Sequence, residues 1–576
     1  MRIGFLTHQF PGVRSGGIGT YVLQAARVLA EAGHEAHIFT PALPADVRAG
    51  VPANVTLHEV ADLATRVAEG GLPAELAAAT ESGGEAVYRL AIGWLLCEAA
   101  REFHAAELAA GRGGLDILET PEYEALGLPL LLQEHGERGG PRPFPVVTQL
   151  HLCSAIAREG NLGSVSGGRQ ETSDADALID AFEFAAIALT DGLCAPTQTI
   201  ATETRRISGI ERTPVILQHP LRPAPGPAPL PENGPILFVG RLEPRKGTDL
   251  MPEAFSRFLL CNPDATIRLV GSDTQWGGGS VRHHILSAMM PGVRDRVIFA
   301  GEKSPAEVSR EFAACRFSIC PSLFESYGYV AAESLLAGRA VVVSSGIGAT
   351  EIVGDAGLVF ARGSAKQLAE AMEKLWRDRR LCAEASARAR QRALELADPA
   401  RAVGGRIGFY QKVRATWSAA PGKGAAGALA CLRPEHAAAI LQGLSALTGA
   451  LAGVALPQSQ TSGARLLSVM EKIAAETGAP ARVLLYGAGR FTARLLAQKH
   501  LWEKQGHRVE GLIDDHPRFA GMGTHLGLPI CNIAGLIARA EQGRISPIVL
   551  STDSFQEQFW RQTELLRRRG VAVYRL

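Results

Sequence analysis

Three basic side chains follow one apolar run near the middle of the chain. The segment Gly-Arg-Leu-Glu-Pro-Arg-Lys-Gly at 240–247 comes directly after residues 235–239 and carries these cations. Arginine offers a planar fork of donors and lysine a compact charge, so Arg241 and Lys246 are expected to bind a departing diphosphate. Arg245 is expected to be a lesser contact. Taken alone, the motif is also compatible with a solvated basic loop.

Two glutamates follow a later apolar run, at 317–320. Glu325 is predicted to lie in the loop after this run and Glu333 on the next helix. Eight helical steps span roughly 12 Å, whereas the acid pair of a glycosidase stands about 5–9.5 Å apart. The spacing therefore favours two ends of one elongated ligand. Backbone N–H groups would lie between the two acids, at Ser326, Tyr327 and Gly328.

Two weaker motifs occur earlier in the chain. In Ser-Gly-Gly-Ile-Gly-Thr-Tyr (15–21), Gly16 and Gly17 would let backbone N–H groups approach an anion at a helix N-terminus. An ordinary tight turn explains the same residues. His151 stands at the end of the apolar run 146–150 and would face the same cleft, although a lone histidine after a strand is often structural.

The acidic segment 119–124, Glu-Thr-Pro-Glu-Tyr-Glu, follows another expected strand. Glu119, Glu122 and Tyr123 are candidates for contact with an acceptor. An acidic first turn of a helix explains them equally well. Both interpretations stay open at this point.

Strands and helices alternate along most of the chain, which predicts parallel α/β sheets. Strands are expected at 2–7, 115–119, 145–150 and 191–196, then at 235–242, 266–271, 296–301, 317–320 and 340–344, and again from 481. Proline-rich and Gly/Ala-rich stretches divide these blocks. The predicted order is an acceptor-side Rossmann-like domain (1–218), a linker (219–235), a donor domain (236–416), a linker with a helical segment (417–480) and an accessory Rossmann-like domain (481–576).

Composition excludes several classes of protein. The 59 basic and 58 acidic residues leave a net charge of +1, and no zinc-finger spacing occurs, so nucleic-acid binding is not expected. Nine scattered cysteines without a C-x-x-C pair, and a first segment unlike a secretory signal, predict a cytoplasmic protein with reduced thiols. The Ala-rich stretch 437–463 is predicted to form a packed helical hairpin.

Together, Ser-Gly-Gly-Ile-Gly-Thr-Tyr, the His151 strand end, Gly-Arg-Leu-Glu-Pro-Arg-Lys-Gly, the E-x7-E segment and Ser-Ser-Gly-Ile-Gly-Ala-Thr-Glu-Ile-Val-Gly-Asp (344–355) resemble retaining glycosyltransferases of family 4. The resemblance covers roughly residues 1–415. It implies a GT-B fold, in which two Rossmann-like domains face a cleft, and here a third Rossmann-like domain is attached. It also implies a nucleotide-diphosphate sugar as donor.

The resemblance implies a role for each matching residue. Gly16 and Gly17 would line the donor phosphates, Arg241 and Lys246 would bind the diphosphate, and Glu325 would sit near the transferred sugar. Glu333 would accept hydrogen bonds from the ribose hydroxyls, and His151 would touch the donor sugar. Backbone contacts would come from Ser326, Tyr327 and Gly328. The catalytic set is then His151, Arg241, Lys246 and Glu325.

The resemblance also implies transfer with retained anomeric configuration to a saccharide, lipid-linked or other hydroxyl acceptor, in polysaccharide or glycoconjugate synthesis. No metal and no separate cofactor are expected. The D-x-D at Asp174–Asp176 is assigned to a polar loop. Peripheral membrane contact stays open. The alternatives are a nucleotide-sugar epimerase, a phosphorylase, or a non-catalytic nucleotide-binding protein acting through the C-terminal domain.

The third α/β unit has an incomplete nucleotide fingerprint. Gly487 and Gly489 fit a G-x-G-x-x-G pattern whose last glycine is replaced by threonine, and Asp514 could hold a ribose after the next strand. The alternative is a docking or dimerisation domain, which would make the chain a homo-oligomer.

Overall fold

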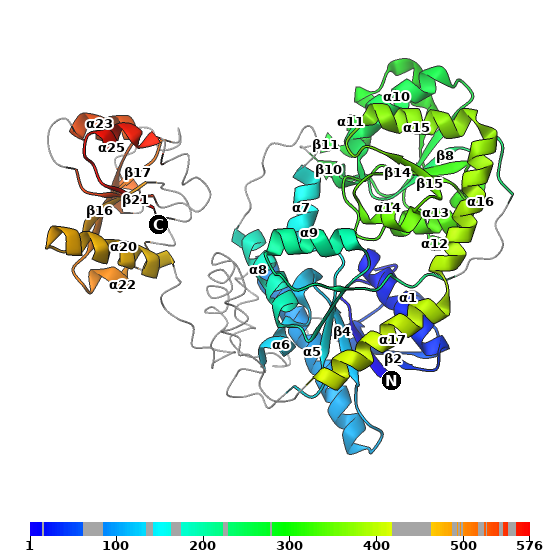
Figure 1. The fold of residues 1–576 in the computed structure, drawn as a ribbon, viewed down its shortest axis with the longest axis horizontal. Helices are drawn as coiled ribbons and strands as arrows, with labels where there is room; N and C mark the ends of the chain where they lie inside the picture. The colour runs from blue at the N-terminus through cyan, green and yellow to red at the C-terminus, as the bar shows by residue number, and fades with distance from the viewer. Residues whose placement is uncertain are drawn as a thin grey trace. The chain divides into compact units, whose positions relative to one another are not determined.

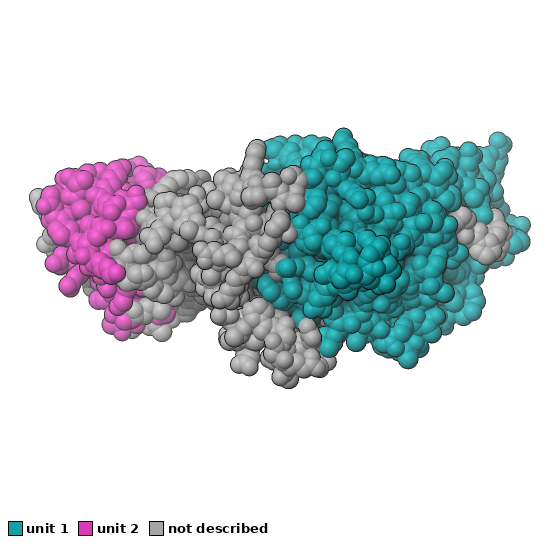
Figure 2. Space-filling model, turned by 90° about the horizontal axis from the view of Figure 1, so that it is seen from below, with its two compact units in different colours: residues 1–454 teal, residues 455–576 magenta. Residues whose placement is uncertain are grey.

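The chain forms two compact units, residues 1–454 and 455–576, coloured separately in Figure 2. The first unit contains two large parallel sheets and the second contains a third sheet. The computed structural model describes residues 1–13, 16–61, 84–133, 142–162, 174–222, 229–276, 279–417, 462–486, 492, 496, 499–515, 524–525, 527–540, 545–550, 560 and 562–575.

The first sheet has seven parallel strands in the order β3-β2-β1-β4-β5-β6-β7. The direction of chain progression reverses between β1 and β4, which pair with each other. The strands are β1 (Arg2–Leu6), β2 (Glu35–Pro41), β3 (Val55–Val60), β4 (Ile117–Pro121), β5 (Val146–Gln149), β6 (Gly192–Ala195) and β7 (Val215–Ile216). The helical segments are α1 (Gly17–Glu31), α2 (Ala45–Ala49), α5 (Gly84–Ala109), η1 (Tyr123–Ala125), α6 (Leu128–Gln133), α7 (Ser154–Leu162), α8 (Asp174–Leu189) and α9 (Gln198–Ser208).

The second sheet has six parallel strands in the order β12-β9-β8-β13-β14-β15, and here the order reverses between β8 and β13. The strands are β8 (Ile236–Val239), β9 (Ile267–Val270), β12 (Val297–Phe299), β13 (Phe317–Cys320), β14 (Val341–Ser344) and β15 (Gly357–Phe360). The helical segments are η2 (Pro244–Lys246), η3 (Thr248–Leu250), α10 (Met251–Cys261), α11 (Val281–Ala288), η4 (Pro291–Arg296), α12 (Pro305–Ala314), α13 (Tyr329–Leu336), α14 (Gly348–Val353), α15 (Ala365–Arg377) and α16 (Arg379–Leu396). A small hairpin joins β10 (Gln275–Trp276) to β11 (Gly279–Ser280).

Apolar periodicity accounts for these elements. The strands of both sheets are mostly buried runs, as expected when helices cover both faces of a parallel sheet. In α1 the buried face includes Tyr21, Val22, Ala25 and Leu29, which recur with helical spacing. The chain then turns at Gly33, where φ is +84°. The strands expected in the first two blocks are all present.

The long helix α17 (Pro399–Thr416) follows the second sheet in the chain but packs on the first sheet (Figure 1). Its Tyr410 and Val413 belong to the same hydrophobic core as Ile3 and Val147. The last helix before residue 417 therefore ties the two sheets of the first unit together.

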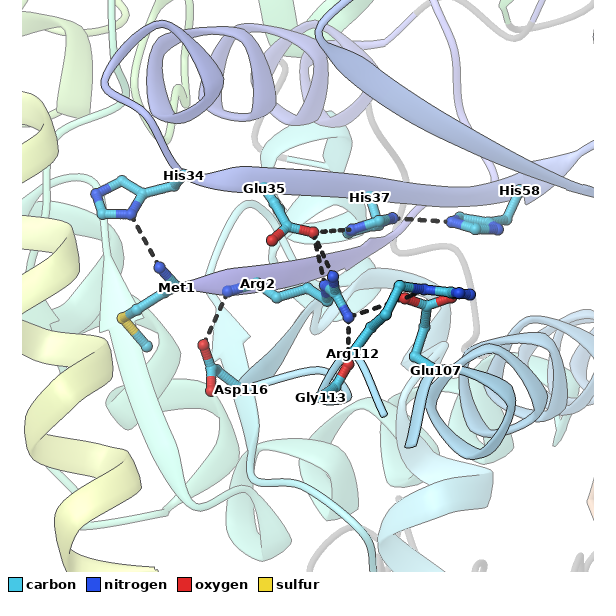
Figure 3. A network of polar contacts seen from close by, with 10 residues as sticks. All are labelled: Met1, Arg2, His34, Glu35, His37, His58, Glu107, Arg112, Gly113 and Asp116. Carbon is cyan, nitrogen blue, oxygen red and sulfur yellow. Dashed lines mark hydrogen bonds and ion pairs between the residues drawn. The ribbon is translucent and has the colours of Figure 1, made fainter. Parts of the chain in front are cut away.

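A polar network closes the amino ends of the first sheet (Figure 3). Arg2 of β1 donates from Nε to Glu35 Oε2 at 2.7 Å and from Nη1 to Glu107 Oε2 at 3.1 Å. The Arg2 main-chain N–H donates to Asp116 Oδ2 at 2.8 Å. Ligands of open α/β sheets bind at the opposite, carboxyl ends of the strands. We therefore interpret this network as structural.

The second unit is built on a sheet with the order β18-β19-β17-β16-β20-β21. Helix α20 packs on it through Leu466, Met470 and Ile473, so this helix belongs to the C-terminal core. The described elements are α20 (Ser462–Thr477), β16 (Arg482–Tyr486), α22 (His500–Glu503), β17 (Arg508–Ile513), β18 (Thr524–His525), β19 (Leu528–Cys531), α23 (Ile533–Ala540), β20 (Ile548–Leu550), α25 (Glu564–Arg568) and β21 (Val573–Arg575).

Parts of the sequence predictions fall outside these residues. The hairpin predicted at 437–463 does so except for its last two positions, as do parts of the two linkers. The four predicted boundaries between these five segments stay predictions. Among the helices that the structure describes, none is both long and apolar enough to cross a membrane.

Candidate active site

Lys246 and Glu325 meet at the point where the order of the second sheet reverses. Lys246 ends η2, directly after β8, and Glu325 lies in the loop after β13. The Lys246 ammonium donates a hydrogen bond to Glu325 Oε1. The turn after Lys246 requires Gly247, where φ is +77° and an added Cβ would stand 2.1 Å from the Pro321 carbonyl oxygen. This close approach brings the two loops together at the edge where such sheets bind ligands.

The Glu325 carboxylate is held in its charged form. Burial alone would raise the pKa of Glu325, but Lys246 and Arg245 outweigh this effect and lower it below the usual value. Ser322 also donates to Glu325 Oε1, at 3.0 Å. The side chains of Lys246 and Glu325 are 16% and 13% exposed, so both groups remain within reach of a ligand.

The two arginines near Lys246 differ in how freely their guanidinium groups can bind a ligand. Arg241 is 61% exposed and stands 3.3 Å from Glu243. Arg245 is buried, and it donates to the Phe324 carbonyl at 3.2 Å and to Glu243 at 2.5 Å. Arg245 therefore braces the loop that carries Glu325, whereas Arg241 can turn toward an anion.

The N-terminus of α1, on the first sheet, lies close to Tyr329, the first residue of α13, which follows the loop that carries Glu325. Helix α1 begins at Gly17 after its N-cap Gly16, and helix α13 begins at Tyr329 after Gly328. A Cβ built on Gly17 would stand 3.9 Å from Tyr329 Cδ2. Each helix N-terminus presents unpaired N–H groups and the positive end of a dipole. The site thus combines Lys246 with two helix ends that favour an anion.

The loop between β13 and α13 contains backbone N–H groups without a described acceptor. Within the part of the chain that the structure describes, no acceptor takes the amide protons of Ser326, Tyr327 or Gly328. The other groups of this loop are engaged: the Ser326 carbonyl accepts from Thr197 Oγ1 at 2.6 Å, and the Tyr327 hydroxyl donates to the His219 carbonyl at 3.1 Å. The rest of the loop is thus held in place, and the contact of these three N–H groups with a donor stays a prediction.

Glu333 lies on α13, one turn beyond Tyr329. No described side chain or backbone group forms a hydrogen bond or ion pair with its carboxylate. Burial raises the pKa of Glu333 to about 7. A half-ionised carboxylate without a protein partner is suited to accept hydrogen bonds from ligand hydroxyls.

His151 follows β5 and is only 4% exposed. Its main-chain N–H donates to both oxygens of Glu122, at 2.7 and 2.8 Å. Its ring lies 4.9 Å from that of Tyr21 and 5.1 Å from that of His219, measured between centroids. Burial, together with the charge of Arg406, lowers the pKa of His151 to about 3. The imidazole is therefore neutral at physiological pH.

Comparison with known proteins agrees with this geometry. Residues 16–220 match the glycosyl transferase 4-like domain and residues 228–392 match the glycosyl transferases group 1 family. A D-inositol 3-phosphate glycosyltransferase from Acidothermus cellulolyticus is 30% identical over 60% of this chain and 74% of its own length. A D-inositol 3-phosphate glycosyltransferase from Stackebrandtia nassauensis is 27% identical over 63% of this chain and 80% of its own length.

The chain belongs to the group 1 glycosyltransferases. It is therefore a glycosyltransferase that uses a nucleotide-sugar donor, and the epimerase, phosphorylase and non-catalytic alternatives are not favoured. Its first unit has the GT-B fold, which it shares with sucrose-phosphate synthase from Thermosynechococcus elongatus (TM-score 0.51, 18% identity, 72% of this chain and 100% of that one). It also shares the fold with TarM of S. aureus, solved as a mutant with fondaparinux, alpha-GlcNAc-glycerol and UDP (TM-score 0.52, 10% identity, 71% and 100%).

The acidic segment of this glycosyltransferase after β4 serves its own fold. The Glu119 carboxylate accepts from Tyr410 at 2.5 Å and from Arg406 at 2.8 Å, and it also binds Tyr21. Glu122 holds the N–H of His151. The sequence left open an acceptor contact or an acidic first helix turn for these residues. In the structure Glu119 lies within β4 and Glu122 makes no side-chain cap, and both carboxylates bind groups of the protein itself.

The sequence did not reveal Glu183 of α8, whose buried carboxylate binds the turn that follows His151. Its carboxylate accepts from the Ser154 N–H at 2.6 Å, the Ser154 hydroxyl at 2.8 Å and the Glu124 N–H at 3.1 Å. It thereby fixes the turn from His151 into α7. Burial raises its pKa to about 7 and that of Glu122 to about 8. No local signal in the sequence marks Glu183, since its partners are 29 or more residues away.

The D-x-D that the sequence assigned to a polar loop instead forms the first turn of α8, which begins at Asp174, and Asp176 stands 3.5 Å from Arg158. In the second unit Gly487 and Gly489 lie outside the described residues. Asp514 follows β17, as expected, and its neighbour Asp515 accepts from the Ile533 N–H at 2.8 Å. A nucleotide site there stays a prediction.

Proposed function

We propose that this glycosyltransferase moves a sugar from a nucleotide diphosphate to an acceptor hydroxyl with retention of the anomeric configuration, and that it needs neither a metal ion nor a separate cofactor. One observation carries the proposal. The Lys246–Glu325 pair stands at the reversal point of the donor sheet, beside the N-termini of α1 and α13.

The cations of the site suit the leaving group. As the bond to the sugar breaks, negative charge develops on the diphosphate, and preorganised donors stabilise that charge most effectively in a closed site. Lys246 supplies a fixed charge, Arg241 a mobile fork, and Gly17 the first amide of α1. These groups can neutralise the diphosphate without a metal, which supports metal independence.

Retention follows from attack on the face that the leaving group vacates. Glu325 is engaged by Lys246 and Ser322, which argues against its use as a covalent nucleophile. We infer that the departing phosphate oxygen takes the proton of the acceptor hydroxyl while the new bond forms on the same face. In this scheme neutral His151 contacts the transferred sugar, and Glu333 accepts hydrogen bonds from the ribose.

The names of the related proteins suggest the substrates. The curated relatives act on D-inositol 3-phosphate, and the TarM complex contains UDP. We propose a UDP-sugar donor and a polyol or saccharide hydroxyl acceptor, free or lipid-linked. All eight cysteines in the described part of the chain are free thiols, which supports our placement of the protein in the reducing cytoplasm.

A donor screen tests the proposal. The full chain is incubated with UDP-glucose, UDP-N-acetylglucosamine or GDP-mannose, with and without D-inositol 3-phosphate, myo-inositol or glucose, in the presence of EDTA. We expect one donor to release nucleotide diphosphate and, with an acceptor, to yield a glycoside with the anomeric configuration of the donor by NMR. An inverted product, or activity only after addition of a divalent cation, would contradict the mechanism.

A further inference from the structure

Hydrogen bonds at one edge of the candidate site connect the two sheets of the first unit. Thr197, the N-cap of α9 on the first sheet, donates from Oγ1 to the Ser326 carbonyl at 2.6 Å. Glu351, on α14 of the second sheet, accepts from the Gln198 N–H at 2.9 Å and the Thr199 N–H at 2.7 Å. We call Thr197, Gln198, Thr199, Ser326 and Glu351 the α9 latch.

The N-terminus of α9 is completed by the other sheet. The first amides of a helix have no partner within the helix. Thr197 satisfies one of them locally, because its Oγ1 accepts from the Ile200 N–H at 3.3 Å. The two amides at Gln198 and Thr199 are satisfied by Glu351, and the Thr199 hydroxyl also donates to it at 2.5 Å. A carboxylate here is also favoured by the helix dipole.

The latch is rigidly connected to the loop that carries Glu325. Gly348, the first residue of α14, donates from its N–H to the Glu325 carbonyl at 2.7 Å. A Cβ on Gly348 would stand 1.9 Å from the Ser326 carbonyl oxygen, so the two segments are in direct backbone contact. A displacement of Glu351 relative to α9 must therefore move the loop that holds Glu325 against Lys246.

We propose that Thr197 and Glu351 are positioning residues for sugar transfer: they clamp the 325–328 loop against the first sheet when nucleotide is bound and release it afterwards. This inference rests on the proposed function of that loop. Glu351 is exposed to solvent, so its bonds to the two amides of α9 are individually weak and can break in every catalytic cycle. Closure of this kind excludes water from the reacting sugar, and its reversal permits product release.

Variants of the full chain test the latch. Thr197→Val removes the bond to Ser326, and Glu351→Gln removes the charge and one of the two carboxylate acceptors, so each variant weakens the latch. Thr197→Ser retains the hydroxyl, and Glu384→Gln is a control on α16, where the glutamate pairs with exposed Arg380. We expect kcat to fall about tenfold in the first two variants, because misplacement of a reacting group by 1 Å can cost about 100-fold. Affinity for UDP is expected to change less than about threefold, since its phosphate contacts remain. The ratio of donor hydrolysis to transfer is expected to rise, whereas Thr197→Ser and Glu384→Gln keep wild-type values.

A second measurement does not depend on turnover. Hydrogen exchange of the peptide that contains Gln198 and Thr199 reports on the two latched amides directly. We expect UDP to slow this exchange in the wild type and not in Glu351→Gln, with equal melting temperatures for the two proteins. The latch would be overturned if Glu351→Gln kept the wild-type kcat and hydrolysis ratio. It would also be overturned if the substitution did not alter hydrogen exchange of this peptide. Absence of transfer by the wild type itself would instead contradict the proposed function.

Discussion

The two sheets of the first unit both place glutamates at their carboxyl edges, but they use them differently. On the first sheet Glu119 is only 2% exposed and is surrounded by Tyr21, Arg406 and Tyr410. Glu122 and Glu183 are equally occupied, by the backbone of the turn that follows β5. Every one of these acids has its oxygens filled by the protein, so it stabilises the fold.

On the second sheet Glu325 and Glu333 each keep a carboxylate oxygen that no described group of the protein binds. Glu325 is bound by Lys246 and Ser322 at one oxygen, and Glu333 has no partner among the described residues. A side chain that lacks internal partners contributes little to folding and can bind a ligand instead. The contrast indicates that the first sheet supplies a rigid platform and the second sheet supplies the groups that bind the donor.

The largest expected effect tests the platform. Arg406→Met leaves the Glu119 carboxylate buried without its cation, and breaking such a pair costs about 3–5 kcal/mol of unfolding free energy. Arg414→Ala is the matched control on the same helix, since Arg414 is 57% exposed beside Asp116 and its pair should contribute about 0–1 kcal/mol. Denaturant unfolding of both variants measures the difference. Equal destabilisation would contradict the structural role of Glu119.

The next largest effect tests the groups of the second sheet that bind the donor. Lys246→Ala removes the cation that faces the diphosphate, and loss of one such preorganised donor lowers kcat by about 100- to 1000-fold. Lys366→Ala, on the exposed face of α15, provides the control. Turnover is measured with the donor selected by the screen. A rate within about twofold of the wild type would show that Lys246 does not stabilise the leaving group.

The smallest effect concerns pH. The pKa of Glu333 is raised to about 7, so the group is mostly protonated at pH 6 and mostly ionised at pH 8. Only the ionised form accepts hydrogen bonds from both ribose hydroxyls, and we therefore expect donor affinity to increase about tenfold between about pH 6 and pH 8. Glu333→Gln should bind the donor weakly and without this slope. A variant that keeps the wild-type pH profile would assign the titration to another group.

Much of the fold was predictable because it depends on local patterns. Apolar runs followed by helical periodicity indicated the strands of both sheets in the first unit. The motifs around Lys246 and Glu325 each follow a parallel strand of one sheet, and because the carboxyl ends of parallel strands share one edge, local patterns account for their proximity.

The sequence by itself determined the α/β architecture, the family and the positions of the groups that can bind a diphosphate, since these depend on periodicity and on short motifs. Only the tertiary structure decided which acids are open. Glu119 and Glu333 look alike in the sequence, yet Glu119 is satisfied by α17, 287 residues away, and Glu333 is not satisfied at all by the described chain. The same holds for Glu351, whose partners are about 150 residues distant. Burial and hydrogen bonding across such separations leave no local pattern to read.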